Sequence, residues 1–142
     1  MTRRAFTLME VLAALTVTIL LAAGSLVVGR QVLAHQQEEV FLRAVAVNWT
    51  TLRRRVEETG QAGKLTVTAD ALSYTLADVP FAYLRVPASM TLTDGLGVIT
   101  YSSAGAFSDV TAIKLTRGNG RLVTLSFQMQ WGLFRQKEEA SK

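Results

Sequence analysis

The sequence of 142 residues contains no cysteine and a single histidine. The absence of cysteine excludes disulfides, iron–sulfur clusters, cysteine-ligated zinc and a lipid anchor on cysteine. One histidine, His35, is too few for a histidine-rich metal site or a Ser–His–Asp triad. We therefore predict that the protein is not an enzyme and that it binds neither a metal nor a cofactor.

Charged residues are also scarce, at 18% of the chain, whereas apolar residues make up 49%. This balance excludes an intrinsically disordered chain, and the length allows one domain with a short appendage. The aspartates Asp70, Asp78, Asp94 and Asp109 have the spacing of turn residues and give no credible set of nucleophile and base. The net charge of +4 is compatible with nucleic acid or anionic lipid as a partner but identifies neither.

Much of the apolar content lies in one block near the start of the chain. Residues 11–29 contain no charge, and this block has about the length of a membrane span. Arg3 and Arg4 precede the block, whereas Arg30 alone directly follows it. The positive-inside rule then predicts a single-pass protein with a cytoplasmic N-terminus and the remaining residues outside the cell membrane.

The helical pattern continues beyond this block as an apolar stripe. Apolar residues recur at spacings of four, four, three and four, at Phe41, Val45, Trp49, Leu52 and Val56. No proline interrupts residues 6–58, and Gly60 is well placed as a C-terminal cap. A continuous helix over this region would contain about 53 residues and would be roughly 80 Å long.

After Gly63 the sequence changes to β-branched residues, alternation and turn signals. Short strands are predicted at 65–68, 73–76, 82–86, 90–93 and 98–101, with a turn-rich joint at 94–97. The clearest alternation covers 123–131, and a hairpin turn at 117–121 connects it to another strand at 111–116. The apolar stripe is the candidate cover for this antiparallel sheet, and the charged residues 135–142 are predicted to fray.

An acidic residue, Glu10, stands directly before the charge-free block. A carboxylate costs roughly 2.5–3.5 kcal/mol at the centre of a membrane span and less near its end, so it calls for a positively charged partner. Glu10 completes the motif Arg3-Arg4-Ala5-Phe6-Thr7-Leu8-Met9-Glu10. This motif resembles the class III signal of type IV pilins and pseudopilins, in which a basic leader and a small residue precede Phe-Thr-Leu-hydrophobic-Glu and an apolar helix.

The resemblance implies a processing step and a set of partners. A membrane prepilin peptidase would cleave between Ala5 and Phe6, and the new N-terminal Phe6 would be N-methylated. Glu10 would then pair with the N-terminal amine of a neighbouring subunit during filament assembly. The implied partners are other pilins or pseudopilins, the peptidase, the membrane platform and ATPase of the assembly machinery, and membrane lipid before assembly.

The family resemblance also implies an α+β fold in which a long N-terminal helix, first transmembrane and then amphipathic, packs on a small antiparallel sheet. The chain has Ala5 where the family usually has glycine, and it lacks both the proline within the apolar segment and the C-terminal cysteine pair of many pilins. The two absences favour a minor pilin or pseudopilin. The expected division is 1–5 as leader, 6–30 as transmembrane helix, 31–60 as amphipathic helix, 61–134 as globular sheet domain and 135–142 as charged tail.

The ending Leu125-Ser126-Phe127-Gln128-Met129-Gln130-Trp131-Gly132 is similar to ComGD-type minor pseudopilins of Gram-positive competence systems, which build the pilus that captures transforming DNA. A minor pseudopilin of type II secretion shares the N-terminal motif and remains an alternative. Two further alternatives are a secreted binding module, with a signal peptide whose apolar core is 11–21 and whose cleavage region is 20–24, and a signal-anchored module.

Direct contact with DNA is a separate hypothesis that depends on basic side chains. The run at residues 53–55 is the densest basic cluster, and such clusters can contact phosphates. The same run can instead form ion pairs with Glu57 and Glu58 on a solvated helix face. Basic residues around the predicted hairpin could extend the surface, so the candidate contacts are Arg53, Arg54, Arg55, Lys114, Arg117 and Arg121.

Overall fold

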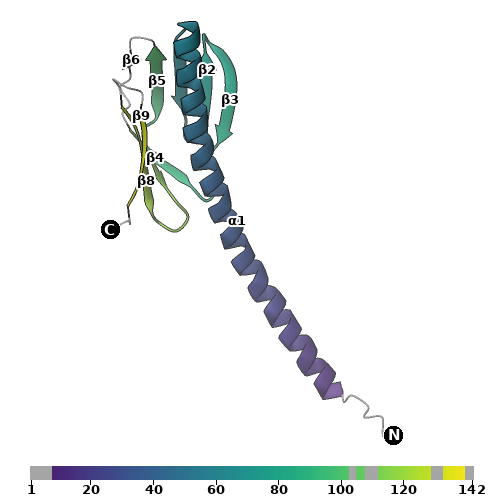
Figure 1. Ribbon diagram of the computed structural model, residues 1–142. Coiled ribbons are helices and arrows are strands. Elements are labelled where there is room, and N and C mark those ends of the chain that lie inside the picture. Colours follow the sequence, from purple (N-terminus) through teal and green to yellow (C-terminus); the bar gives the residue numbers. More distant parts are fainter. Residues whose placement is uncertain (1–7, 103–104, 108–111, 129–132, 140–142) are drawn as a thin grey trace. The chain divides into compact units, whose positions relative to one another are not determined.

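The computed structural model describes residues 8–102, 105–107, 112–128 and 133–139, without the side chains of 25–28, 105–107, 128 and 133. Within these residues one helix is followed by nine strands (Figure 1). The chain forms two compact units, Met1–His35 and Gln36–Lys142. The elements are α1 (Leu8–Thr59), β1 (Gly63–Val67), β2 (Ala71–Leu76), β3 (Val79–Arg85), β4 (Thr91–Asp94), β5 (Gly97–Ser102), β6 (Gly105–Phe107), β7 (Ala112–Thr116), β8 (Leu122–Gln128) and β9 (Leu133–Glu139).

The described part of the first unit is helical and apolar. Helix α1 is long and apolar enough to cross a membrane, and none of its most apolar stretch is buried within the protein. Two hydroxyl groups in this stretch are satisfied by the helix itself, because Thr16 Oγ1 donates to Leu12 O at 2.7 Å and Thr18 Oγ1 donates to Ala14 O at 2.8 Å. Internal satisfaction of polar groups is what a helix surrounded by hydrocarbon requires.

The second unit contains two antiparallel sheets, and not the single sheet that the sequence suggested. The five-stranded sheet has the order β3-β2-β1-β5-β6, and the four-stranded sheet has the order β4-β7-β8-β9. The turn-rich joint at 94–97 explains the difference, because β4 before it pairs with β7 whereas β5 after it pairs with β1. The joint therefore carries the chain from one sheet to the other.

The predicted hairpin at the end of the chain is confirmed. Strands β7 and β8 pair from Ala112↔Ser126 to Thr116↔Leu122. Their turn closes when Arg117 N donates to Arg121 O and Gly120 N donates to Arg117 O, both at 2.9 Å. Gly120 has a φ of 80°, which glycine adopts without the steric cost of a side chain.

The five shorter predicted strands are also present, with bounds that differ by a few residues. Pro80 lies inside β3, although the predicted strands 73–76 and 82–86 leave it in the connection between them. Strand β3 is at the edge of the five-stranded sheet, where a residue without an N–H group is tolerated.

The prediction of a frayed tail from residue 135 is wrong for the residues up to Glu139. Strand β9 pairs with β8 along its length, from Leu122↔Glu139 to Gln128↔Leu133. Phe134 anchors the strand by packing against the core, with its ring 5.6 Å from that of Phe127. The charges of β9 fit its position at the edge of a sheet, where they hinder pairing with other molecules. Met129 and Trp131, which were expected to continue the preceding strand, lie outside the described residues.

The apolar stripe of α1 forms the centre of the core, as predicted. Phe41, Val45, Trp49, Leu52 and Val56 are all buried, and they cluster with buried side chains from both sheets. Trp49 makes edge-on ring contacts with Tyr101 of β5 at 5.9 Å and with Phe127 of β8 at 4.8 Å. One side chain of α1 therefore joins the two sheets.

The end of α1 also agrees with the prediction. Gly60 follows the last helical residue with a φ of 69°, and its N–H group donates to Val56 O at 2.8 Å. A glycine in this left-handed conformation is a common helix C-cap.

Candidate functional site

Glu10 occupies the first turn of α1, directly before the charge-free residues 11–29. Its side chain is exposed in the single chain. A carboxylate in the first helical turn interacts favourably with the helix dipole, by about 0.3–1 kcal/mol at an exposed site. Ala5 and Phe6, the residues at the predicted cleavage point, lie outside the described residues.

The helix beyond Glu10 presents apolar side chains on all its sides. The large apolar residues of this segment are half or more exposed in the single chain: Val11, Leu12, Leu15, Val17, Ile19, Leu20 and Leu21. Leu8 and Met9, directly before Glu10, are exposed as well. Continuous apolar surface of this kind marks a region that contacts membrane or protein. The segment is therefore suited to contact with lipid or with other helices.

Small residues are interspersed among these large ones. A Cβ atom added at Gly24 would meet no other atom within 4 Å, so the surface beside this glycine is open. Small residues let helix backbones approach each other closely in a membrane. The small residues in this segment are Ala13, Ala14, Ala22, Ala23, Gly24 and Ser25.

Two arginines of the 53–55 run form ion pairs along the helix. Arg53 Nη2 lies 3.5 Å from Glu57 Oε1, and Arg54 Nε lies 3.6 Å from Glu58 Oε1. These are the pairs across one helical turn that the solvated-face interpretation predicted. Exposed pairs of this type contribute about 0.3–0.5 kcal/mol each to stability. Arg54 is the more accessible of the two, with 70% of its side chain exposed against 27% for Arg53.

Arg53 and Arg55 also lie over aromatic rings of the sheet. The guanidinium carbon of Arg55 is 4.6 Å from the ring centre of Phe81, and that of Arg53 is 5.8 Å from the ring centre of Tyr101. Cation–π contacts at such sites contribute about 0.5–1 kcal/mol. These contacts direct both guanidinium groups toward the protein, which leaves Arg54 as the most exposed member of the run.

Lys114 is paired with an acidic partner on the neighbouring strand. Its Nζ atom lies 2.9 Å from Asp94 Oδ2. The hydrogen bond from Lys114 and a second from the Gly95 N–H group lower the pKa of Asp94. Lys114 is therefore one partner of an exposed ion pair at the edge of the four-stranded sheet.

Arg117 is buried, with only 2% of its side chain exposed. Its guanidinium group contacts three carboxylates, at 2.6 Å from Glu39, 3.7 Å from Glu138 and 4.0 Å from Glu38. Glu38 is itself buried and also accepts a hydrogen bond from the Gly118 N–H group at 3.2 Å. We refer to Arg117, Glu38, Glu39 and Glu138 as the Arg117 cluster. Because Arg117 is enclosed here, it contributes no exposed cation to a DNA-binding surface.

The six basic side chains do not gather on one patch. Arg121 is 60% exposed and lies 3.5 Å from Glu138, beside the Arg117 cluster. The Arg117 cluster meets α1 at Glu38 and Glu39, whereas Arg54 lies about 15 residues further along, or roughly 22 Å by helical rise. The 53–55 run and the hairpin therefore form two separate basic regions.

Sequence analysis missed Glu38 as a core residue, although a signal was present. Glu38 precedes Phe41 by three positions and Leu42 by four, so it continues the apolar stripe as an acidic residue on the buried face. A buried carboxylate requires a cation or several hydrogen-bond donors. This pattern would have predicted a buried ion pair, although not the identity of Arg117 as its partner.

No group of three or more His, Cys, Asp or Glu side chains that could hold a metal ion occurs in the described part of the chain. Comparisons with protein family models, curated proteins and solved structures find no match to this chain. Function is therefore inferred from the residues of this chain and their geometry.

Proposed function

We propose that the chain is a minor subunit of a type IV pilus-like filament and is anchored in the cell membrane by α1 before assembly. The observation that carries the proposal is the position of Glu10 in the first turn of α1, directly before residues 11–29, which carry no charge and of which residues 11–24 are exposed in the single chain. A plain membrane anchor has no need of a carboxylate there, whereas a filament subunit can use it for pairing.

The apolar surface of α1 gives the physical reason for assembly. In the membrane, lipid covers the exposed side chains of residues 8–24, and in a filament the helices of neighbouring subunits replace that lipid. Association of such helices depends on close packing because hydrocarbon is as apolar as the side chains. The small residues at 13, 14 and 22–25 favour that close packing.

Glu10 would select the axial register of the packed helices. A carboxylate in hydrocarbon is costly, so the arrangement that brings it to a positive charge is favoured over those displaced along the axis. Cleavage by a prepilin peptidase between Ala5 and Phe6 would create such a charge, the α-amine of Phe6 on a neighbouring subunit. Assembly would thereby depend on processing, because only the cleaved chain offers the α-amine of Phe6.

The filament that we propose is the competence pilus, which takes up DNA during transformation. The support is the similarity of residues 125–132 to ComGD-type minor pseudopilins. In this setting the second unit lies on the outer side of the membrane. Arg54 and Arg121 are the basic residues of the candidate set with the largest exposed fractions, so any direct contact with DNA would use them.

Mass spectrometry and an assembly assay test the subunit proposal. The chain in assembled filaments should lack residues 1–5 and carry one added methyl group on Phe6. Glu10→Gln should enter the membrane at the normal level but be lost from filaments, while the matched variant Glu58→Gln, which removes an exposed charge of the second unit, should assemble normally. Filaments that contain residues 1–5, or that incorporate Glu10→Gln as well as the native chain, would overturn the proposal.

A separate assay distinguishes the filament system. Deletion of the chain should abolish transformation by added DNA and leave protein secretion unchanged. Loss of secretion with normal transformation would instead assign the subunit to type II secretion. The double variant Arg54→Gln and Arg121→Gln, in a background where filaments still form, separates direct DNA contact from a purely structural role, since only direct contact predicts weaker DNA capture.

A further inference from the structure

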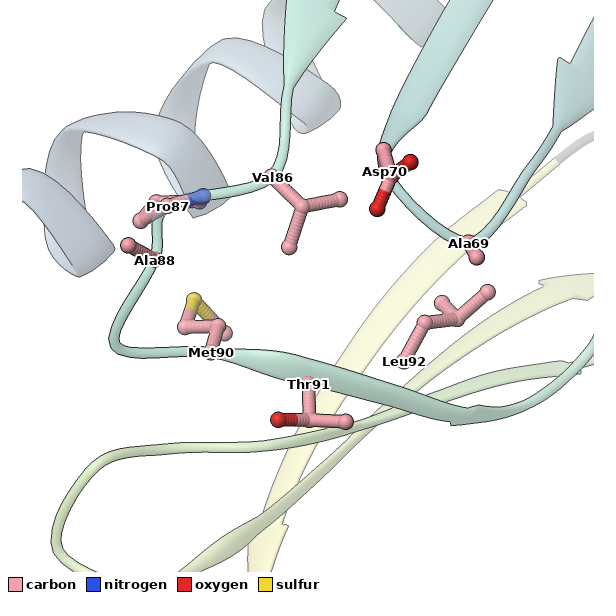
Figure 2. Close-up of a pocket in the computed structure, with 8 residues that line it drawn as sticks. All are labelled: Ala69, Asp70, Val86, Pro87, Ala88, Met90, Thr91 and Leu92. Carbon is pink, nitrogen blue, oxygen red and sulfur yellow. The ribbon is translucent and has the colours of Figure 1, made fainter.

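A cavity of about 330 Å³ lies in the second unit, between the edge of β4 and two connections of the five-stranded sheet. It is lined by the turn between β1 and β2, by the link at 86–88 between β3 and β4, and by residues 90–92 (Figure 2). Ligand pockets in proteins commonly measure about 300–1,000 Å³, so this cavity has room for one long side chain and a short piece of backbone.

Most of the side chains that line the cavity are apolar, and one carboxylate faces it. Figure 2 shows Val86, Leu92 and the Asp70 carboxylate directed toward the same space from three different segments, with Met90 beside them. Asp70 is exposed. A surface that combines aliphatic walls with one acidic group is complementary to a side chain with a long apolar stem and a positive charge at its tip.

The backbone around Asp70 is held in place, although its carboxylate is not engaged. Thr68 N donates to Ala71 O at 2.9 Å, and Val86 N donates to the main-chain oxygen of Asp70 at 2.8 Å. Within the described residues the Asp70 carboxylate has neither a hydrogen bond nor an ion pair. Asp78 and Asp94 differ in this respect, because each pairs with a lysine of this chain. The turn therefore presents a negatively charged side chain on a fixed backbone beside the cavity.

The strand that borders the cavity is open on one side. Among the described residues, β4 pairs with β7 alone and forms the edge of the four-stranded sheet. An edge strand leaves backbone N–H and C=O groups that can pair with an added extended segment. The open edge and the acidic cavity thus adjoin each other along residues 90–92.

We propose that this cavity binds a lysine or arginine side chain of a partner protein, carried on an extended segment that pairs with the open edge of β4. The aliphatic stem of that side chain packs against Val86 and Leu92, and its cationic group meets the Asp70 carboxylate. An acidic side chain binds more weakly because Asp70 repels it, and a purely apolar one leaves the carboxylate without a partner. The inference concerns a single chain and does not depend on filament assembly.

The test uses the ¹⁵N-labelled full chain in detergent micelles and three acetylated, amidated tripeptides. These peptides are Val-Lys-Val, Val-norleucine-Val, which keeps the stem without the charge, and Val-Glu-Val. We expect Val-Lys-Val to shift the amide resonances of residues 69–71 and 86–92. Its affinity should exceed that of the norleucine peptide by about threefold to fivefold, as an exposed ion pair allows. Val-Glu-Val should bind more weakly than either.

Two variants test whether the Asp70 carboxylate causes the preference for the lysine peptide over the norleucine peptide. Asp70→Asn should bind the lysine and norleucine peptides equally, since it keeps the shape of the side chain and removes its charge. The matched control Asp78→Asn removes a charge from the next turn, where it pairs with Lys64, and should keep the preference for lysine. The proposal is overturned if the native chain binds the lysine and norleucine peptides equally, if Asp70→Asn retains the preference, or if no resonance near the cavity shifts.

Discussion

Tyr74 makes the stability of the second unit depend on pH in alkaline solution. Its side chain is fully buried, and its hydroxyl donates to Val45 O of α1 at 3.2 Å. Burial raises the pKa of Tyr74 well above its ordinary value of 10.0. Above pH 10 the unfolded chain therefore loses this proton while the folded chain retains it. The stabilisation is complete below pH 10 and decreases as the pH rises beyond that value.

Tyr74→Phe should remove this pH dependence. Near pH 7 the variant should be less stable by about 1 kcal/mol, because one buried hydrogen bond is lost. Its stability should decline less steeply above pH 10 than that of the native chain. The measurement is urea unfolding from pH 8 to 11.5, followed by near-ultraviolet circular dichroism. Tyr83→Phe, at an exposed tyrosine, should retain the native slope, and an unchanged slope in Tyr74→Phe would show that another group controls alkaline unfolding.

Arg117 is the residue whose loss should cost most among the charged side chains. Arg117→Met leaves the buried Glu38 carboxylate without its cation, and breaking a buried ion pair in this way costs about 3–5 kcal/mol. Arg121→Met, at an exposed partner of Glu138, should change the free energy of unfolding by no more than about 0.5 kcal/mol. Adding Glu38→Gln to Arg117→Met should restore part of the loss in urea unfolding. If the double variant is no more stable than Arg117→Met, the uncompensated charge is not the cause.

The burial of Arg117 could not be predicted from local sequence. The residue begins a hairpin turn, directly before Gly118-Asn119-Gly120, where exposed cations are usual, and its partners Glu38 and Glu39 lie far away in the chain. The side chain becomes buried because folding places the β7–β8 turn beside α1. Glu10 differs, because the motif that marks it as a candidate pairing residue consists of its immediate neighbours in the sequence.

At the scale of elements, a glycine sets the approach of β1 to α1. A Cβ atom added at Gly63 would lie 2.9 Å from both Leu52 Cγ and Val56 Cγ2, closer than real Cβ contacts. Gly63→Ala should therefore destabilise the fold by about 1–3 kcal/mol, as overpacking of a dense core does. Urea unfolding of the full chain measures this change.

A double-mutant cycle tests the cause assigned to Gly63. Leu52→Val alone should cost about 1 kcal/mol because it removes a buried methylene group. In the Gly63→Ala background the same change should cost less, or even stabilise, since it frees the space that the new methyl group needs. Additive effects of the two substitutions would contradict the steric explanation.

The elements that sequence predicted well are those whose pattern is local. The stripe from Phe41 to Val56 and the alternation around the 117–121 turn each identify an element without knowledge of its partners. The separation of the sheets was not predictable in this way, because a joint such as 94–97 has the same turn residues whether it connects paired strands or two sheets. Strand β9 was missed because the charges at 135–139 resemble a solvated tail, and only pairing with β8 orders them.

At the scale of the whole molecule, the pattern of apolar residues changes along α1. Residues 11–29 carry no charge, and the side chains of 11–24 are exposed in the single chain, whereas from Glu38 onward α1 has one buried face and a charged remainder. The change is visible in the sequence because the two patterns differ: a helix that could span a membrane is apolar on all sides, whereas a helix against a sheet is apolar on one face. Glu38 and Glu39 lie where the pattern with one buried face begins.

This division predicts that the second unit folds without the first. Residues 36–142 keep all the buried side chains of the core, and Glu38 and Glu39 would then lie in the first helical turn, where acidic residues are favourable. The fragment should be soluble without detergent and should keep the near-ultraviolet circular dichroism and urea midpoint of the full chain. The shorter fragment 43–142 serves as its control, because it loses Glu38, Phe41 and Leu42.

Removal of Phe41 and Leu42 costs about 5 kcal/mol or more, which is comparable to the whole stability of a small domain. The shorter fragment should therefore be unfolded under conditions where 36–142 is folded. Aggregation or unfolding of 36–142 would show that residues 1–35 contribute to the fold itself. Folding of both fragments would show instead that the N-terminal end of the apolar stripe adds little to the core, and that the fold does not depend on the ion pair of Glu38 with Arg117.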